Sequence, residues 1–234
     1  MKRITCGLCS CGEQRDACCE YEEFYFAAHA RLGRKFRTTE HGNRVRDEGV
    51  RRFAWAVPSR AALACIATHA AQSAQVVDFG AGSGYWAHCV ERYCETPGAK
   101  VIALDERPEL YAGCEWFSVQ RGGVAELCEA LDGGGSGGSS SAAAILLLLI
   151  WPTWGDPMAA IAARLFHERG GERLVYVGED RDGATAAPDF FDEVECSGRW
   201  SEVDTAAVHS WHGRHDRLRV FRRAVQHRSE VRGA

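Results

Sequence analysis

The chain has 234 residues, of which 46% are hydrophobic, enough for one sizeable globular core. Its formal net charge of -4 is close to neutral, so charge alone selects no class of partner. The longest apolar run, residues 142–151, is too short for a membrane span, which takes about 20 residues. The N-terminus shows no apolar segment of a secretory signal. Because the number of cysteines, 11, is odd and no signal is seen, we expect them to be free thiols. We therefore expect a cytoplasmic protein without membrane contact.

The N-terminal region divides into two segments before the main domain. Residues 1–20 are rich in cysteine and lack periodicity, which predicts a disordered tail. Their one CxxC pair leaves structural zinc as an alternative, but no second pair follows, so we predict no metal site. Residues 21–57 form a basic, partly helical extension, with eight Arg or Lys against three acids between Arg31 and Arg52. This segment and the Arg-rich C-terminal part either hold phosphates or are solvated faces.

The main domain is predicted over residues 58–225, followed by a tail at 226–234. Pro58 and Ser59 open a helix that runs to about Ala71, with Ser59 as its N-cap. Strand and helix patterns then alternate: strands at 75–79, 100–104 and 116–119, and a helix at 83–93. The low-complexity stretch at 133–144 is predicted to be a flexible Gly/Ser insertion.

The second half of the domain continues the alternation. Residues 145–150 are the most hydrophobic strand, as expected for the middle of a parallel sheet, and a helix to about 169 and a strand at 173–177 follow. Residues 202–208 and 217–221 are predicted to form an antiparallel pair at the sheet edge. In the second of these, Arg217 and Arg219 alternate with Leu218 and Val220, which predicts one wet and one buried face. The pattern indicates a three-layer α/β fold.

The segment VVDFGAGSGYWA, residues 76–87, contains the clearest binding motif. Glycines at 80, 82 and 84 follow a strand, where the backbone turns sharply and a ligand approaches it, and the next helix points its amides at that ligand. Gly82, Gly84 and Ala87 also satisfy the dinucleotide pattern GxGxxA. Asp78 argues against a dinucleotide, because its carboxylate would repel the pyrophosphate. A cationic amino-acid cofactor without phosphates would tolerate this carboxylate.

VVDFGAGSG and VIALDERP, residues 76–84 and 101–108, resemble the first and second motifs of class I S-adenosylmethionine-dependent methyltransferases. The resemblance covers about residues 51–223. It implies a Rossmann-like three-layer fold with a mostly parallel seven-stranded sheet and an antiparallel edge pair, and S-adenosylmethionine as cofactor. It also implies that Asp105 binds both ribose hydroxyls. The other implied cofactor-binding residues form the loop around the methionine part and begin the next helix: Asp78, Gly80, Gly82, Gly84, Tyr85 and Trp86.

Trp151-Pro152-Thr153-Trp154 resembles the fourth motif of that family, in the W-P-x-aromatic form of a poorly characterised branch. Members that methylate amines have Asp or Asn, two prolines and an aromatic there, so Trp151 and Thr153 make an amine acceptor doubtful. Trp151, Pro152 and Trp154 are predicted to face a planar acceptor by stacking. Core or loop anchoring is the alternative for both tryptophans. A nucleobase in RNA is slightly favoured over a planar small molecule, and a protein acceptor remains open.

His209, between the last two strands, is the first candidate for a base that removes the acceptor's proton, and Glu179 is the second. A surface turn is the alternative for His209. Asp156 is interpreted as a helix cap. Two other functions remain open: a non-catalytic scaffold with the same fold, motivated by the altered fourth motif, and an NAD(P)-dependent oxidoreductase.

Overall fold

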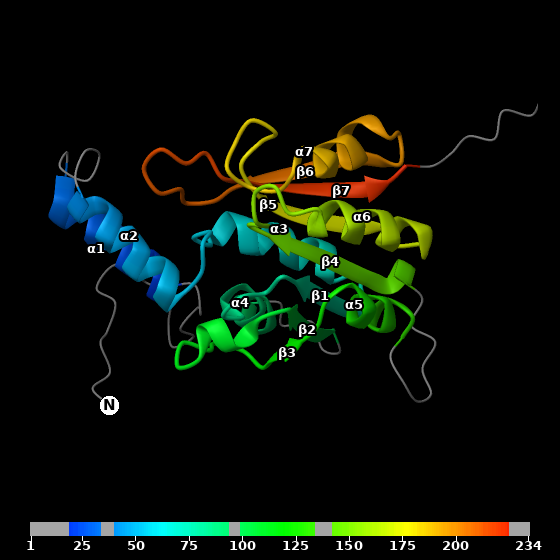
Figure 1. The fold of residues 1–234 in the computed structure, drawn as a ribbon, viewed down its shortest axis with the longest axis horizontal. Coiled ribbons are helices and arrows are strands. Elements are labelled where there is room, and N and C mark those ends of the chain that lie inside the picture. Colours follow the sequence, from blue (N-terminus) through cyan, green and yellow to red (C-terminus); the bar gives the residue numbers. More distant parts are fainter. Residues whose placement is uncertain (1–18, 34–39, 94–98, 134–141, 225–234) are drawn as a thin grey trace, which may run out of the picture.

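The computed structural model describes residues 19–33, 40–93, 99–133 and 142–224. A seven-stranded sheet crosses the molecule in the order β3-β2-β1-β4-β5-β7-β6 (Figure 1). Strands β1 to β5 pair in parallel, whereas β7 is antiparallel to both β5 and β6. The strands are β1 (Gln75–Phe79), β2 (Lys100–Asp105), β3 (Val119–Arg121), β4 (Ile145–Ile150), β5 (Arg173–Gly178), β6 (Trp200–Ala207) and β7 (Arg217–Arg223).

Helices cover both faces of this sheet. Helices α3 and α4 pack on one face, with α1 and α2 beside them, and α5, α6 and α7 pack on the other. The α-helices are α1 (Cys19–Leu32), α2 (Glu40–Arg52), α3 (Arg60–Ala70), α4 (Tyr85–Tyr93), α5 (Val124–Leu131), α6 (Met158–Glu168) and α7 (Pro188–Phe191). Shorter helical turns are η2 (Pro108–Tyr111), η3 (Ala142–Ala144) and the π-helical η4 (Asp192–Cys196).

The hydrophobic pattern of the strands explains the three layers. Every residue of β4 is buried, because helices cover both of its faces. Leu146 and Leu148 face the core shared with α3 and α4, whereas Leu147 and Leu149 face the core shared with α5 and α6. The three-layer α/β fold with an antiparallel edge pair, predicted from the sequence, is confirmed.

Helix α3 begins as its sequence predicts. The Ser59 side chain accepts a hydrogen bond from the Ala62 backbone N–H at 3.1 Å, which is the N-cap interaction. The Ser59 hydroxyl also donates to the Ala207 carbonyl at 2.5 Å. The start of α3 is therefore attached to the end of β6.

The third strand lies later in the chain than predicted. Residues 116–119 were expected to form it, but β3 spans Val119–Arg121. Trp116 instead lies before the strand, where its ring stacks on Phe53 with centroids 5.5 Å apart and its indole N–H donates to the Arg52 carbonyl. Trp116 therefore packs against the segment around Phe53 and does not pair in the sheet.

The prediction that Arg219 lies on a wet face of its strand is wrong. Its side chain is only 6% exposed, because acidic side chains of η4 and β6 pack against it. The guanidinium is paired with Glu202 at 2.6 Å and with Glu195 at 2.7 Å. A charge buried in this way requires such partners.

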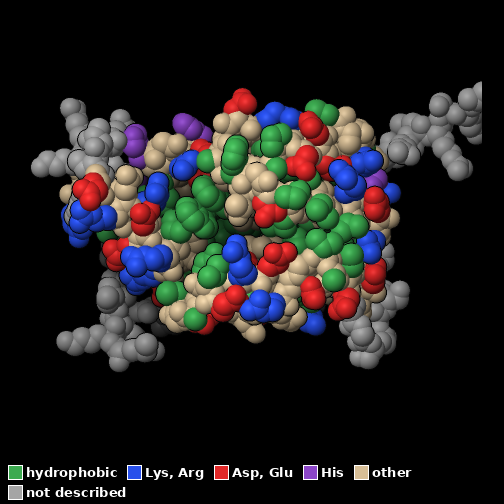
Figure 2. Space-filling model, in the orientation of Figure 1, with side chains coloured by type: hydrophobic (Ala, Val, Ile, Leu, Met, Phe, Trp, Pro, Cys, Tyr) green, Lys and Arg blue, Asp and Glu red, His purple; other side chains and the backbone are tan. Residues whose placement is uncertain are grey.

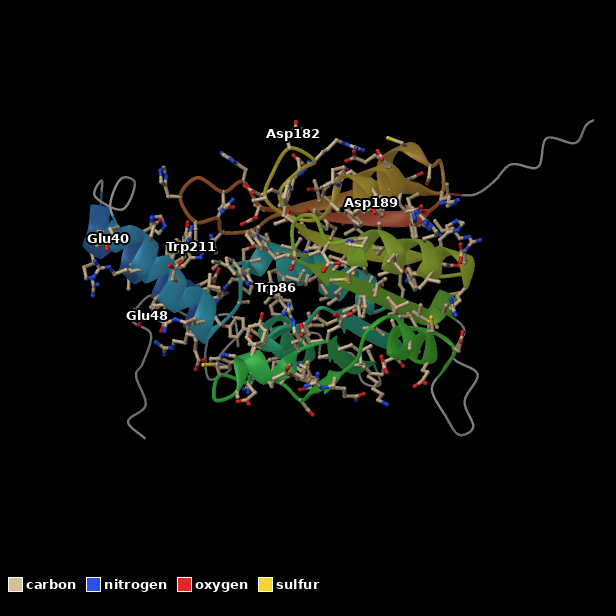
Figure 3. All side chains as sticks on the ribbon, viewed as in Figure 1. Glu40, Glu48, Trp86, Asp182, Asp189 and Trp211 are labelled. Atoms are coloured by element: carbon tan, nitrogen blue, oxygen red, sulfur yellow. The ribbon has the colours of Figure 1, made fainter. Side chains whose placement is uncertain are left out.

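Helices α1 and α2 contribute side chains to the core of the domain. Tyr21 is fully buried, stacks on Phe53 with ring centroids 4.5 Å apart, and donates to the Ala54 carbonyl at 2.7 Å. Trp211, from the segment between β6 and β7, packs against α1 at Tyr25 (Figure 3). The segment that the sequence presents as a basic extension is thus joined to the strands by aromatic contacts.

Several predicted segments lie outside the described residues. These are most of the Cys-rich tail (1–18), most of the Gly/Ser insertion (134–141) and the C-terminal tail (225–234). The end of the insertion, from Ala142, forms η3, in which Ala142 is buried. Among the described helices, none has both the length and the apolar character that crossing a membrane requires.

Candidate functional site

A pocket of about 430 Å³ opens at the carboxyl ends of β1, β2 and β4. In the sheet, β2 lies on one side of β1 and β4 lies on the other, so the strand order reverses at β1. The pocket therefore lies at the topological switch point, where open α/β sheets bind ligands. Hydrophobic side chains gather around a hollow near the middle of the face seen in Figure 2. The lining of the pocket includes Trp55, Asp78, Gly80, Gly82, Trp86, Asp105, Tyr111, Trp151, Pro152, Trp154, Asp156 and Arg214.

The glycine-rich turn after β1 depends on glycine for its backbone shape. Gly80, Gly82 and Gly84 all have positive φ, at 79°, 55° and 74°. At Gly84 a Cβ atom would lie 2.7 Å from the Cβ of Phe117, so a side chain there has no room. Gly80 and Gly82 line the pocket, where bare backbone faces the cavity, whereas Gly84, also predicted to bind the cofactor, does not line it.

Asp78, near the end of β1, is a buried carboxyl group that faces this pocket. Neither of its oxygens accepts a hydrogen bond of normal geometry from the described part of the chain. Burial, reinforced by the charge of Asp105 and opposed by the backbone N–H of Ala87, raises the pKa of Asp78 to about 7. A buried carboxyl group with so few partners favours a cationic or hydrogen-bond-donating ligand.

Asp105, at the end of β2, holds the glycine turn from the neighbouring strand. One carboxylate oxygen accepts from the Gly82 N–H at 2.9 Å, and the other accepts from the Arg107 N–H at 2.8 Å. Each carboxylate oxygen has two acceptor positions, so Asp105 retains the capacity to accept from two hydroxyl groups in the pocket.

The structure separates the two aromatic residues that begin α4. Trp86 lines the pocket, and its indole N–H donates to the Ala56 carbonyl at 3.0 Å (Figure 3). Tyr85 does not line the pocket; it is fully buried and packs edge-on against Tyr21 and Trp116. The reason is the helical geometry, which turns the two neighbouring side chains toward different surroundings.

Trp151 forms the other end of the pocket, directly after β4. Its ring stacks on Trp55 with centroids 4.8 Å apart and planes 7° apart, and the Arg214 guanidinium lies 5.7 Å from its centroid. Its indole N–H donates to Asp216 at 2.8 Å. The backbone φ of Trp151 is +51°, an unfavourable value for a residue other than glycine. The surroundings hold this strained conformation, which is common at functional sites.

A second loop supports the segment that contains Trp151. The Ala186 N–H donates to the Pro152 carbonyl at 2.9 Å, and Thr153 forms an isolated bridge with Thr185. Ala186 itself has a φ of +56°. Pro152 is thereby buried along the pocket wall, whereas Trp154 is 64% exposed at the same pocket.

Behind Trp151 lies a group of buried acids. Burial, with the charge of Glu179, raises the pKa of Asp216 to about 6, against the opposing effects of the Trp151 hydrogen bond and Arg214. Glu179, the second candidate base, does not line the pocket; it accepts from the backbone N–H groups of Ala184 and His215 and pairs with Arg214 at 3.3 Å. Glu179 therefore holds loops together.

His209, the first candidate base, is not brought to the pocket. Its ring pairs with Glu22 at 2.8 Å and stacks on Tyr25 with centroids 5.3 Å apart. The segment after β6 folds back onto α1, and its backbone bridges to Val57, which carries the imidazole away from the cavity. Asp156 does line the pocket, and it accepts from the Met158 N–H at 2.8 Å at the start of α6.

Several lining residues were not singled out from the sequence. Leu110 and Tyr111 come from η2, directly after the second motif, and their position near Asp105 is the signal that marks them. Arg214 lines the pocket and Asp216 stands behind it, and both lie in the segment between β6 and β7. No local pattern marks these two, because only the folded sheet brings them to Trp151.

No protein-family model and no curated protein matches the chain. Among solved structures, it is similar to magnesium protoporphyrin IX methyltransferase from Synechocystis PCC 6803 with bound SAM, at 14% identity and a TM-score of 0.43, over 92% of this chain and 100% of that one. It is also similar to 1,6-didemethyltoxoflavin-N1-methyltransferase from Burkholderia thailandensis, at 16% identity and a TM-score of 0.46, over 93% and 94%. Human N-acetylserotonin methyltransferase gives 14% identity and a TM-score of 0.44, over 90% and 63%. Similarities of this size decide neither the activity nor the substrate of this chain.

Proposed function

We propose that this chain is an S-adenosylmethionine-dependent methyltransferase. The observation that carries the proposal is the carboxyl group of Asp78 beside the glycine turn, which is buried and has no ion pair or hydrogen bond of normal geometry among the described residues. A ligand with a positively charged amino-acid part and no phosphates fits there, whereas the pyrophosphate of NAD would face this carboxylate at short range.

The residues of the first two motifs fit such a cofactor. The bare backbone at Gly80 and Gly82 gives the methionine part close access, and Asp105 has free acceptor positions for two ribose hydroxyls. Trp86 and Tyr111 add apolar walls to the pocket. When bound, the cofactor supplies a methyl group on a positively charged sulfur.

The pocket end near Trp151 suits the methyl acceptor. The exposed Trp154 and Trp55, which Trp151 supports by stacking, offer flat surfaces there, and stacking on such a surface is worth about 1–3 kcal/mol per base. The protein then contributes by aligning the acceptor in line with the methyl group and excluding water. An open pocket lined in this way supports an enzyme over a non-catalytic scaffold.

The arginines of the C-terminal region bear on the choice between RNA and a small molecule. Arg214, Arg217 and Arg219 are paired with Glu179, Asp180 and Glu202. Their charges are therefore already compensated, which leaves less positive charge for phosphates. Within the proposal, a planar small molecule is the first acceptor class, and a nucleobase in RNA is the second.

Calorimetry of the purified chain tests the cofactor. We expect micromolar binding of S-adenosylmethionine and S-adenosylhomocysteine, no binding of NAD, and loss of binding in Asp105→Ala. The control Asp132→Ala removes an exposed carboxylate that pairs with Arg169 and does not line the pocket, and it should bind normally. Binding of NAD alone, or of neither methyl donor nor product, would overturn the proposal.

A transfer assay with tritiated methyl groups then tests the acceptor. Pools of planar metabolites and of RNA are compared with the wild type and with Trp151→Ala. Labelling of small molecules that Trp151→Ala abolishes supports the first acceptor class. Labelling of RNA that falls steeply with added salt supports the second class, since salt weakens phosphate contacts.

A further inference from the structure

Three side chains with metal-binding atoms converge away from the pocket. Cys65 and His69 lie four residues apart on α3, so they share one face of the helix, and Asp204 reaches them from β6. One Asp204 oxygen lies 3.5 Å from the Cys65 sulfur and 3.2 Å from the His69 Nε2, and all three ligand atoms lie within 4.8 Å of one another. None of the three residues lines the pocket.

These separations suit a tetrahedral zinc ion. With Zn–S of about 2.3 Å and Zn–N and Zn–O of about 2.0 Å, tetrahedral angles place sulfur and oxygen about 3.5 Å apart and nitrogen and oxygen about 3.3 Å apart. The observed distances of 3.5 and 3.2 Å are close to these values. A thiolate, an imidazole and a carboxylate together are a ligand set for zinc, whereas Mg²⁺ and Ca²⁺ favour oxygen alone.

The local geometry of β6 directs the Asp204 carboxylate toward Cys65 and His69. The pairing of β6 with β7 is irregular between Glu202 and Asp204, and such a bulge redirects a side chain. The other Asp204 oxygen accepts from the Thr205 N–H at 2.8 Å, which leaves one oxygen for the shared position. Ser59 and Ala207 hold α3 and β6 together nearby, so the three ligand atoms come from two elements fixed to each other.

Binding of a metal ion at this site requires the Cys65 thiol to lose its proton. Hydrogen bonding with His69 and the Thr205 N–H holds the pKa of Asp204 below its usual range, so the carboxylate is ionised. Burial and the nearby Asp204 raise the pKa of the Cys65 thiol to about 12, so the thiol keeps its proton without a metal. On binding, a zinc–sulfur bond replaces the S–H bond, and the proton passes to solvent.

We propose that Cys65, His69 and Asp204 bind one Zn²⁺ ion, with water in the fourth position. The ion joins α3 to the edge strand β6 and stabilises the domain. It is independent of the proposed methyl transfer, because its ligands lie outside the pocket. In the absence of zinc binding, the same three residues would form a hydrogen-bonded contact between helix and strand.

Zinc and cobalt titrations of the full chain test the site. The N-terminal cysteines Cys6, Cys9, Cys11, Cys18 and Cys19 are also thiols, so the parent protein for the test has all five replaced by serine. We expect one equivalent of Zn²⁺ to bind to this parent and Co²⁺ to give a thiolate charge-transfer band. We also expect zinc to raise the melting temperature, since a ligand that binds only the folded state stabilises it.

Single substitutions in that parent assign the ligands. Cys65→Ser, His69→Ala and Asp204→Asn should each weaken zinc binding at least about tenfold, and Cys65→Ser should remove the cobalt band. Cys128→Ser, at a half-buried cysteine of α5, is the matched control and should bind normally. Circular dichroism of each metal-free variant checks its folding. Zinc binding that survives Cys65→Ser and His69→Ala, or a parent that binds no zinc, would overturn the proposal.

Discussion

The two ends of the pocket are constructed differently. The end near Asp78 and Asp105 is built mainly from backbone: one short turn with three positive φ values, held by a carboxylate from the next strand. The end near Trp151 is built from side chains that meet from positions 55, 151, 214 and 216. The first end therefore depends on local geometry that few residues can adopt, and the second depends on contacts that only the complete sheet creates.

The largest expected effect comes from adding one methyl group at each end. Gly84 and Gly155 both have a φ of +74°, but a Cβ at Gly84 would meet Phe117 at 2.7 Å, whereas a Cβ at Gly155 would meet nothing within 4 Å. Gly155→Ala should therefore cost only the backbone strain, about 1 kcal/mol of unfolding free energy. Gly84→Ala adds overlap and should cost about 2–5 kcal/mol.

Urea unfolding followed by circular dichroism measures both glycine variants. Calorimetry should also show that Gly84→Ala loses cofactor binding while Gly155→Ala keeps it. Equal losses of stability in the two variants would mean that the glycine turn is not restricted by its neighbours.

The next effect concerns pH at the Asp78 end. Burial raises the pKa of Asp78 from 3.8 to about 7, so the folded state holds a proton that the unfolded state has released. The free energy of unfolding should therefore fall as pH rises from about 4 to about 7. A cationic cofactor requires the ionised form, so its affinity should be about tenfold lower at pH 6 than at pH 8.

Asp78→Asn is the variant that tests this proton. It should flatten the pH dependence of both the unfolding free energy and cofactor affinity, while binding the cofactor more weakly than the wild type at pH 8. Calorimetry across this pH range, in buffers of different ionisation enthalpy, counts the protons released. An affinity of the wild type that does not change with pH would contradict the assignment of Asp78.

The smallest expected effect concerns the Trp151 end. Asp216, with its pKa raised to about 6, accepts from the Trp151 indole N–H. Tryptophan fluorescence of the wild type should show a transition near pH 6 as this acid ionises. Asp216→Asn keeps an acceptor but cannot ionise, so its transition should disappear, and Trp151→Phe should lose the transition too. Asp216→Ala should cost about 1 kcal/mol, because the indole N–H loses its partner.

Strand β1 and the glycine turn after it, which form the backbone-built end of the pocket, could be predicted from the sequence. Strand β1 and the three glycines lie within ten residues, and each constrains its neighbours directly, so their roles follow from local patterns. Asp105 could be placed because parallel strands bring their carboxyl ends together. Tyr85 was assigned to the site by its neighbourhood in the sequence, but the structure does not bring it to the pocket, since α4 turns it into the core.

Less could be predicted about the second end of the pocket and about β7. The contact of Trp55 with Trp151 and that of Asp216 with Trp151 join residues far apart in the chain, so no spacing reveals them. His209 was placed near the acceptor because it lies between two strands, but contacts with α1 determine its position. Arg219 alternates like a surface residue, and only the folded structure shows that Glu202 of β6 and Glu195 of η4 pair with it.

The position of β7 between β5 and β6 has a consequence for how the chain folds during synthesis. Both neighbours leave the ribosome before β7, so the edge of β5, with buried Leu174, Val175 and Tyr176, has no partner until residues 217–223 emerge. An unpaired hydrophobic strand edge can pair with other chains. Closing the sheet by inserting the last strand is also a non-local and therefore slow step. Nascent chains stalled before residue 217 should accordingly be the form of this protein most prone to aggregation and most dependent on chaperones.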